Sequence, residues 1–162
     1  MRFPRTLRLD DSDDHAFERA AQAGEWAVAG GFAFADDQPE TLAGKRRQAF
    51  RNGFLGTSSF GWSTLVAVTE IEAVEYEAVV EALAQHLLKS YGAPNIGAAR
   101  EAARGETEFA AGLCTHKLNT LLAVEREFGP QGVVERFRSI EPPREALHAR
   151  IWNIVEDGRE RG

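Results

Sequence analysis

Cysteine is nearly absent from this chain of 162 residues. Its one cysteine, Cys114, cannot form a disulfide within the chain. Such low cysteine usage is typical of a reducing compartment, so we predict a cytoplasmic protein. Long apolar runs are also missing. No uncharged apolar stretch approaches the roughly 18 residues that a membrane-spanning helix needs. The first 14 residues are charged and have no apolar core, so we expect neither a signal peptide nor a membrane partner.

A basic excess is missing as well. Lys and Arg total 19 against 25 Asp and Glu, which gives a formal net charge of −6 at pH 7. General nucleic-acid binders normally carry a basic excess, so we predict no nucleic-acid partner. The composition, 43% hydrophobic and 27% charged, is typical of a soluble globular protein. At this length we expect one compact domain, residues 1–162.

Metal-binding and catalytic spacings are also absent. The four histidines are His15, His86, His116 and His148. Cys114 and His116 are two residues apart on a predicted helix and would point in different directions, so we predict no metal, and we find no cofactor motif. The turn from Gly56 to Gly61 is rich in small residues. It follows a helix and precedes a strand, the reverse of the order in a nucleophile elbow or a P-loop. The sequence names no catalytic residue and leaves enzymatic activity open.

The N-terminal half shows the alternation of β-strands. The predicted strands are Phe3–Leu9, Glu25–Ala35 and Phe60–Ile71. Within the second, Gly30 and Gly31 indicate a bulge or a close approach by another part of the chain. These strands predict a three-stranded antiparallel sheet.

Helical spacing dominates the rest of the chain. The predicted helices are Ser12–Ala21, Pro39–Asn52, Glu72–Tyr91, Asn95–Arg104, Thr107–Phe128 and Pro142–Gly158. Gly105 is expected to break or bend the chain between two of them. Residues 131–140 fit either a helix or an edge strand, and we favour the helix. The expected fold is α+β, with the N-terminal sheet covered by helices and a C-terminal half that is all helical.

The segment Lys45–Thr64, KRRQAFRNGFLGTSSFGWST, is the best candidate for a site. It combines cations, aromatic rings, glycines and hydroxyl groups between a predicted helix and a predicted strand. Arg47 and Arg51 lie one helical turn apart, where two guanidinium groups can hold a carboxylate or phosphate. Hydroxyl groups and backbone amides of the following loop would complete the cradle. The predicted ligand-binding residues are Arg47, Arg51, Ser58, Ser59 and Trp62.

The same residues also have structural interpretations. Cations near a helix C-terminus complement the helix dipole, and this helix could pair with Glu77 and Glu81 on the next one. Docking to an acidic partner surface is a further alternative. Phe60 and Trp62 share one strand face, so they are either buried in the sheet or line one wall of a pocket. Trp152 lies off the apolar stripe of the last predicted helix and favours a homodimer.

Two functional hypotheses follow. The first, which we favour, is a non-enzymatic accessory or interaction protein acting through a surface that includes Lys45–Trp62. The second is a protein or enzyme that binds a small anionic ligand, a carboxylate or a phosphate, in a pocket at Lys45–Thr64.

Three segments carry a resemblance to a known family. FPRTLRLD, GEWAVAGGFAF and AFRNGFLGTSSFGWSTLVAV resemble a family of small proteins of unknown function from alphaproteobacteria. The resemblance extends over most of the chain. It implies a bacterial cytoplasmic protein and brings no catalytic residue, ligand or fold with it.

Overall fold

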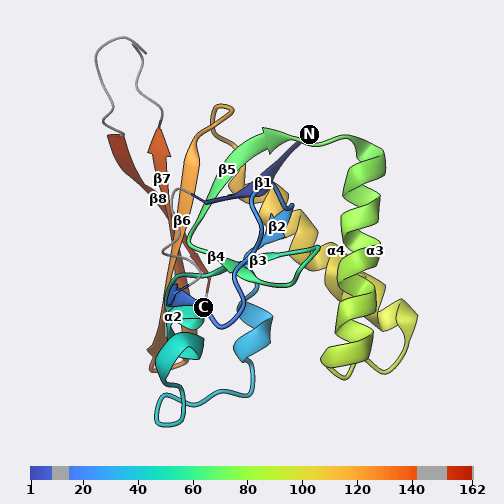
Figure 1. The fold of residues 1–162 in the computed structure, drawn as a ribbon, viewed down its shortest axis with the longest axis vertical. Helices are drawn as coiled ribbons and strands as arrows, with labels where there is room; N and C mark the ends of the chain where they lie inside the picture. The colour runs from blue at the N-terminus through green and yellow to red at the C-terminus, as the bar shows by residue number, and fades with distance from the viewer. Residues whose placement is uncertain (9–14, 142–152, 162) are drawn as a thin grey trace.

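Two antiparallel sheets, three α-helices and one 3-10 helix form the main elements of the described part of the chain (Figure 1). A computed structural model describes residues 1–8, 15–141 and 153–161. The larger sheet has the order β1-β5-β6-β7-β8 and consists of Arg2–Leu7 (β1), Leu65–Glu70 (β5), Leu121–Gly129 (β6), Gly132–Glu141 (β7) and Asn153–Arg161 (β8). The smaller sheet consists of Ala27–Val28 (β2), Phe54–Gly56 (β3) and Trp62–Ser63 (β4). The helices are the 3-10 helix Gly31–Phe34 (η1) and the α-helices Gly44–Asn52 (α2), Ala73–Ser90 (α3) and Ile96–Leu113 (α4).

The first predicted strand is confirmed and the second is much shorter than predicted. Strand β1 pairs with β5 along its whole length. The predicted strand Glu25–Ala35 retains only β2, because the chain turns at Gly30 with φ of 84° and continues as η1. A Cβ atom on Gly30 would lie 2.7 Å from Cβ of Leu55, so glycine is needed both for its backbone angle and for this close approach.

The third predicted strand is divided between the two sheets. Its first part, β4, pairs with β3, and its second part, β5, pairs with β1 and β6. The chain passes from one sheet to the other at Thr64. Next to this corner, Oγ of Ser63 lies 2.8 Å from the carbonyl oxygen of Leu65. A continuous apolar pattern therefore does not require one continuous strand.

The predicted helix Glu72–Tyr91 is confirmed as α3. Asn95 caps α4 as predicted, with its side-chain oxygen accepting a hydrogen bond of 2.8 Å from the amide of Ala98. The expected break at Gly105 is wrong, because α4 runs through it. Helix α2 begins at Gly44, later than predicted. The predicted helix Ser12–Ala21 falls partly outside the described residues, and its described end contains no helix beyond residue 16.

The prediction of an all-helical C-terminal half is wrong. Strands β6 and β7 form a long antiparallel hairpin, and β8 pairs with β7. Residues 131–140, for which we favoured a helix, lie mostly in β7. The predicted last helix fares no better, because Ile154 and Val155 belong to β8, while residues 142–152, with Leu147 and Trp152, lie outside the described residues.

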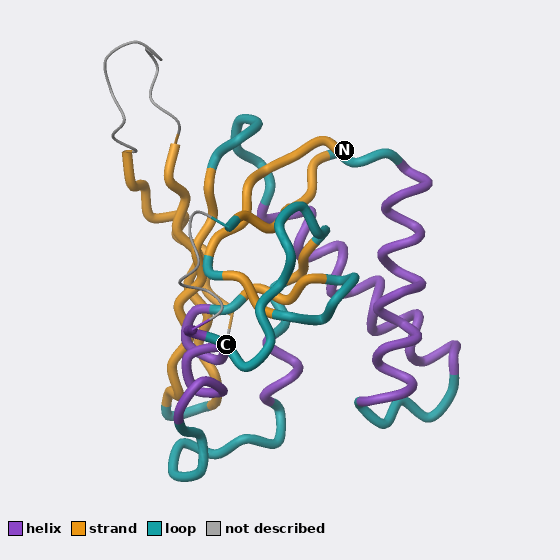
Figure 2. The backbone as a smooth tube through the Cα atoms, viewed as in Figure 1, coloured by secondary structure: helices purple, strands orange, loops and turns teal. Residues whose placement is uncertain are grey.

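The helices flank the sheets on different sides (Figure 2). Helices α3 and α4 lie side by side, and their buried stripes share a core with β1, where the rings of Phe3 and Tyr76 meet edge to face at 5.6 Å. Helix α2 lies instead against β6. Its Phe50 packs edge to face on Phe34 of η1, with ring centroids 5.4 Å apart. Helix α2 carries two of the five predicted site residues, Arg47 and Arg51, and is packed between β6 and the 3-10 helix η1.

Candidate functional site

A buried arginine on β6 anchors the C-terminal end of α2. The guanidinium group of Arg126 donates to the carbonyl oxygens of Phe50 at 3.0 Å and Gly53 at 2.8 Å. The last carbonyl groups of a helix have no hydrogen-bond donor within the helix and carry partial negative charge. A cation at this end supplies the missing donors and balances the charge. The positive charge is balanced by Glu135 on β7, whose Oε2 lies 2.6 Å from Nε of Arg126. The orientation of α2 is therefore determined from inside the fold.

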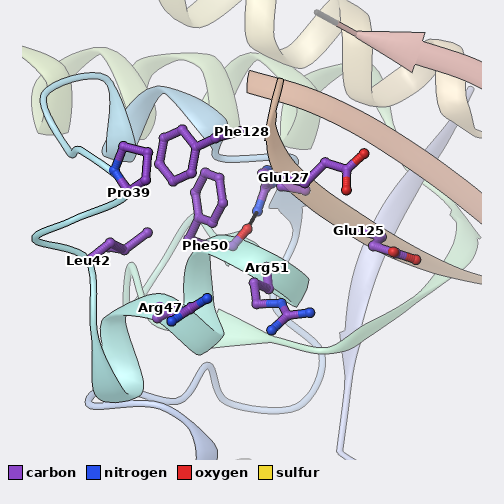
Figure 3. A pocket seen from close by; sticks show the side chains of 9 residues that line it. Pro39, Leu42, Arg47, Phe50, Arg51, Glu125, Glu127 and Phe128 are labelled. Atoms are coloured by element: carbon purple, nitrogen blue, oxygen red, sulfur yellow. Dashed lines mark hydrogen bonds between the residues drawn. The ribbon is translucent and has the colours of Figure 1, made fainter. Parts of the chain in front are cut away.

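The cations of α2 divide between two hollows, one on each side of the helix. The first, which we call the arginine cleft, has a volume of about 200 Å³. Its lining residues are Pro39, Leu42, Arg47, Phe50, Arg51, Glu125, Arg126, Glu127 and Phe128. Figure 3 shows Arg47 and Arg51 projecting together from α2, with the apolar side chains on one side and Glu125 and Glu127 on the other. The rings of Phe50 and Phe128 are stacked at 4.5 Å and form part of its apolar wall.

Of the three arginines that line this cleft, Arg47 and Arg51 have no side-chain partner within the described residues. Neither the guanidinium of Arg47 nor that of Arg51 makes a hydrogen bond or ion pair with any residue in the described ranges. The acidic residues nearby are already engaged, because Glu125 pairs with Arg138 at 3.2 Å and Glu127 pairs with Arg136 at 3.4 Å.

The pairing of α2 with α3 that the sequence suggested is not what the structure records. Glu77 and Glu81 form ion pairs with α4 instead, to Arg104 at 2.8 Å and to Arg100 at 2.9 Å. Hydrogen bonds from Arg100 and Gln85 lower the pKa of Glu81 to about 2. The charges of α2 are therefore not explained by the acidic face of α3.

The second hollow lies between α2, the loop before β4 and the C-terminal end of α3. We call it the aromatic hollow, and its volume is about 370 Å³. Its lining residues are Glu18, Arg19, Lys45, Arg46, Ala49, Phe60, Trp62, His86 and Tyr91. Phe60 and Trp62 thus do line one cavity together. Burial, followed by the charge of Arg19, lowers the pKa of His86 and favours the neutral imidazole.

The two predicted serines have a structural task away from both hollows. Buried Glu25 accepts hydrogen bonds from the amides of Ser58 at 3.0 Å and Ser59 at 2.8 Å, and from the hydroxyl of Ser59 at 2.7 Å. Burial raises the pKa of Glu25, but the hydrogen bonds from Ser59, Gln22 and Ser58 outweigh burial and hold the pKa below its usual range. The serine loop is therefore closed around a carboxylate of the protein itself.

The predicted site residues consequently fall in three places. Arg47 and Arg51 share the arginine cleft, Trp62 lies in the aromatic hollow, and the serines surround Glu25. No local pattern pointed to Arg19 and His86, which come from segments distant from α2. The sequence showed Lys45 and Arg46 as cations of the same helix. They face a different hollow from Arg47 because successive residues of an α-helix are rotated by about 100° around its axis.

Other kinds of site are not seen in the described residues. In that part of the chain, no three His, Cys, Asp or Glu side chains are grouped as metal ligands would be. None of its helices is both long and apolar enough to cross a membrane.

Residues 1–154 match a protein family described as "Family of unknown function (DUF6505)". The chain belongs to this family. Helix α2 and both hollows lie within the matched residues, so they are part of the DUF6505 region. The expected resemblance to a family of unknown function is thereby confirmed. No curated protein and no solved structure matches the chain. Any function of this DUF6505 protein must therefore be argued from its geometry.

Proposed function

We propose that this protein binds a small anionic ligand in the arginine cleft, through a carboxylate or phosphate group held by Arg47 and Arg51. The observation that carries the proposal is the state of these two cations. Like charges four residues apart on a helix repel each other, and no acidic side chain in the described residues forms an ion pair with either arginine. A bound anion would turn that repulsion into two charge-assisted hydrogen bonds.

The walls of the cleft add a preference to this charge. Pro39 and Phe128 give one side an accessible apolar surface, and the buried Leu42 and Phe50 lie behind it. An anionic head group at the arginines therefore leaves space for a short apolar tail against these residues. A volume of about 200 Å³ suits a small molecule and not a long chain. The ligand class that fits is a short-chain carboxylate, with phosphate as the simplest alternative head group.

Calorimetric titration with hexanoate, acetate and inorganic phosphate tests the proposal. We expect hexanoate to bind more tightly than acetate, because only hexanoate reaches the apolar wall. The double variant Arg47→Ala/Arg51→Ala should weaken binding at least tenfold, or about 1.4 kcal/mol. The control is Arg100→Ala/Arg104→Ala, which removes two exposed arginines from α4 and should leave the affinity unchanged. No binding of any probe, or equal loss in both double variants, would refute the proposal.

A role as an accessory or interaction protein is the second candidate. It is supported by the exposure of Lys45, Arg47 and Arg51 on one helix, which suits an acidic partner surface. The geometry favours the ligand, because the two arginines border a concave site with an apolar wall and not a flat surface. The two candidates separate by experiment. If the protein is an interaction protein, a purified acidic partner should bind the Arg47→Ala/Arg51→Ala variant more weakly than the wild type, with or without hexanoate present. If the cleft is a ligand site, hexanoate should bind to the purified protein without any partner.

The setting of this function is also a proposal. We propose a cytoplasmic protein of alphaproteobacteria that acts as a homodimer. Cys114 is buried and is the one cysteine of the sequence, so no disulfide forms within the chain, as is usual in a reducing compartment. Light scattering of the purified chain tests the oligomeric state, and fractionation of expressing cells tests the compartment.

A further inference from the structure

The aromatic hollow has features that the arginine cleft does not explain. Its wall is built from flat rings, with Phe60 and His86 stacked at a centroid distance of 3.7 Å and an angle of 7°. The ring of Tyr91 stands against His86 at 5.3 Å. Trp62 completes the lining and is only partly buried. Rings that remain accessible in a cavity offer stacking surfaces to a flat ligand.

Phe60 is held in an unfavourable backbone conformation to make this wall. Its φ of 56° lies in the left-handed region, which a bulky residue rarely adopts. Hydrogen bonds hold the loop of residues 58–61 in place. Glu25 accepts hydrogen bonds from the amides of Ser58 and Ser59, and the hydroxyl of Ser59 accepts one from the amide of Gly61 at 3.0 Å. Strain of this kind persists only where surrounding contacts impose it, and it concentrates at binding sites.

Cations surround the rings. Arg46 is fixed by Asp37, with Nε to Oδ1 at 3.0 Å, and by the carbonyl of Ala33 at 3.0 Å. Arg19 reaches the carbonyl of Ser59 at 3.3 Å. Lys45 is exposed, and its ammonium group makes no contact of this kind within the described chain. Asp37 balances the charge of Arg46, and the lining contains one further carboxylate, that of Glu18, so the three cations remain in excess.

We propose that the aromatic hollow is a second binding site, specific for an anion that carries a planar ring. The ring stacks on the wall formed by Phe60, His86 and Trp62, and the anionic group lies at Lys45 and Arg46. This chemistry occurs in aryl carboxylates and in nucleoside monophosphates. The site lies on the other side of α2 from the arginine cleft, so its occupation does not depend on that of the cleft.

Calorimetric titration with four probes tests both parts of this chemistry. Benzoate and AMP carry a ring and a negative charge, whereas adenosine has no charge and acetate has no ring. We expect benzoate or AMP to bind at least tenfold more tightly than adenosine and acetate. Binding of benzoate alone identifies an aryl carboxylate site, and binding of AMP alone a nucleotide site. If neither binds more tightly than adenosine and acetate, the proposal is overturned.

Variants on the two sides of α2 locate the binding. Lys45→Glu should weaken binding of the ring-bearing probe at least tenfold, while Arg47→Glu, the same reversal on the side of the cleft, should change it less than twofold. Phe60→Gly removes the ring from a position whose backbone suits glycine, so it should keep the fold and lose binding. Equal effects of Lys45→Glu and Arg47→Glu would overturn the proposal. Hexanoate binding in the Lys45→Glu variant reports separately on the arginine cleft, so failure of one site is distinguishable from failure of the other.

Discussion

Arg126 and Glu135 face each other across β6 and β7 inside the protein, with Nε and Oε2 2.6 Å apart and the two side chains almost wholly buried. The pair does more than neutralise itself, because Arg126 also binds the end of α2. The pair thus connects the large sheet to α2, the helix that contributes side chains to both candidate sites.

Breaking this pair should strongly destabilise the protein. In Glu135→Gln the charge of Arg126 remains buried without its counterion, which typically lowers the free energy of unfolding by about 3–5 kcal/mol. The control is Glu127→Gln, which removes an exposed ion pair with Arg136 and should lower it by less than about 1 kcal/mol. Urea denaturation followed by circular dichroism measures both. If both variants lose less than about 1 kcal/mol of unfolding free energy, the carbonyl groups at the end of α2 are sufficient to stabilise the buried charge of Arg126.

Two glycines should respond to alanine in opposite directions. A Cβ atom on Gly61 would lie 2.6 Å from the backbone carbonyl of Ala20, which cannot move aside easily. Gly61→Ala should therefore lower the free energy of unfolding by about 1–3 kcal/mol. Gly105 lies inside α4 with open space around it, so Gly105→Ala should raise it by about 0.5–1 kcal/mol. Thermal denaturation of both variants provides the measurement, and a destabilised Gly105→Ala would contradict the continuous helix.

The backbone at Phe60 predicts an unusual order of stability. Both Phe60→Ala and Phe60→Gly lose the stack on His86. The φ of 56° at this position is unfavourable for alanine but not for glycine. Phe60→Gly should be the more stable variant by about 1 kcal/mol. At Phe128, which lies in strand β6, the order should be reversed, because glycine is unfavourable in a strand. Urea denaturation of the four variants decides. The same order at both positions would argue against the left-handed conformation.

The network around Glu25 predicts a dependence of stability on pH. The pKa of Glu25 is lower in the folded protein than its ordinary value of 4.5, so its contribution is fully present above about pH 4.5. It is lost as pH falls below 4.5 through the folded pKa. At pH 7, Glu25→Gln should be less stable by about 2 kcal/mol, because it weakens charge-assisted hydrogen bonds to the serine loop.

The measurement is urea denaturation of the wild type and Glu25→Gln between pH 7 and pH 3. The difference between the two proteins should be constant near neutral pH and should shrink below pH 4.5. The exposed Glu101 gives the matched control, Glu101→Gln, whose stability should follow that of the wild type. A constant difference down to pH 3 would exclude Glu25 as the titrating group.

Local signals in the sequence predicted α3 and the start of α4 well. The stripe of α3 and the cap at Asn95 depend on neighbouring residues along the chain, so periodicity and capping rules find them. Strand β6 was missed, and the strand alternative for residues 131–140 was ranked below the helix, for one physical reason. Their inward positions include Arg126, Glu135 and Ser139, polar residues that pattern rules place at the surface. The buried pair therefore concealed the alternation of both strands.

The candidate site shows the same division. Helical rotation placed Arg47 and Arg51 on one face of α2, which the spacing of four residues predicted. Nothing along the chain brought Arg19 or His86 to Lys45, since those segments meet only when the fold closes. Ser58 and Ser59 were expected beside the arginines, yet they bind Glu25, a partner more than thirty residues away.

The sequence by itself determined α3, the beginning of α4, the short first strand and the concentration of cations on α2. It did so because each depends on residues within a few positions of one another. The tertiary structure alone decided that the C-terminal half is a sheet, that Arg126 holds the end of α2, and that the segment Lys45–Thr64 contributes to two separate hollows. These features arise from pairing and burial between distant segments, and such contacts form only when the whole chain is packed.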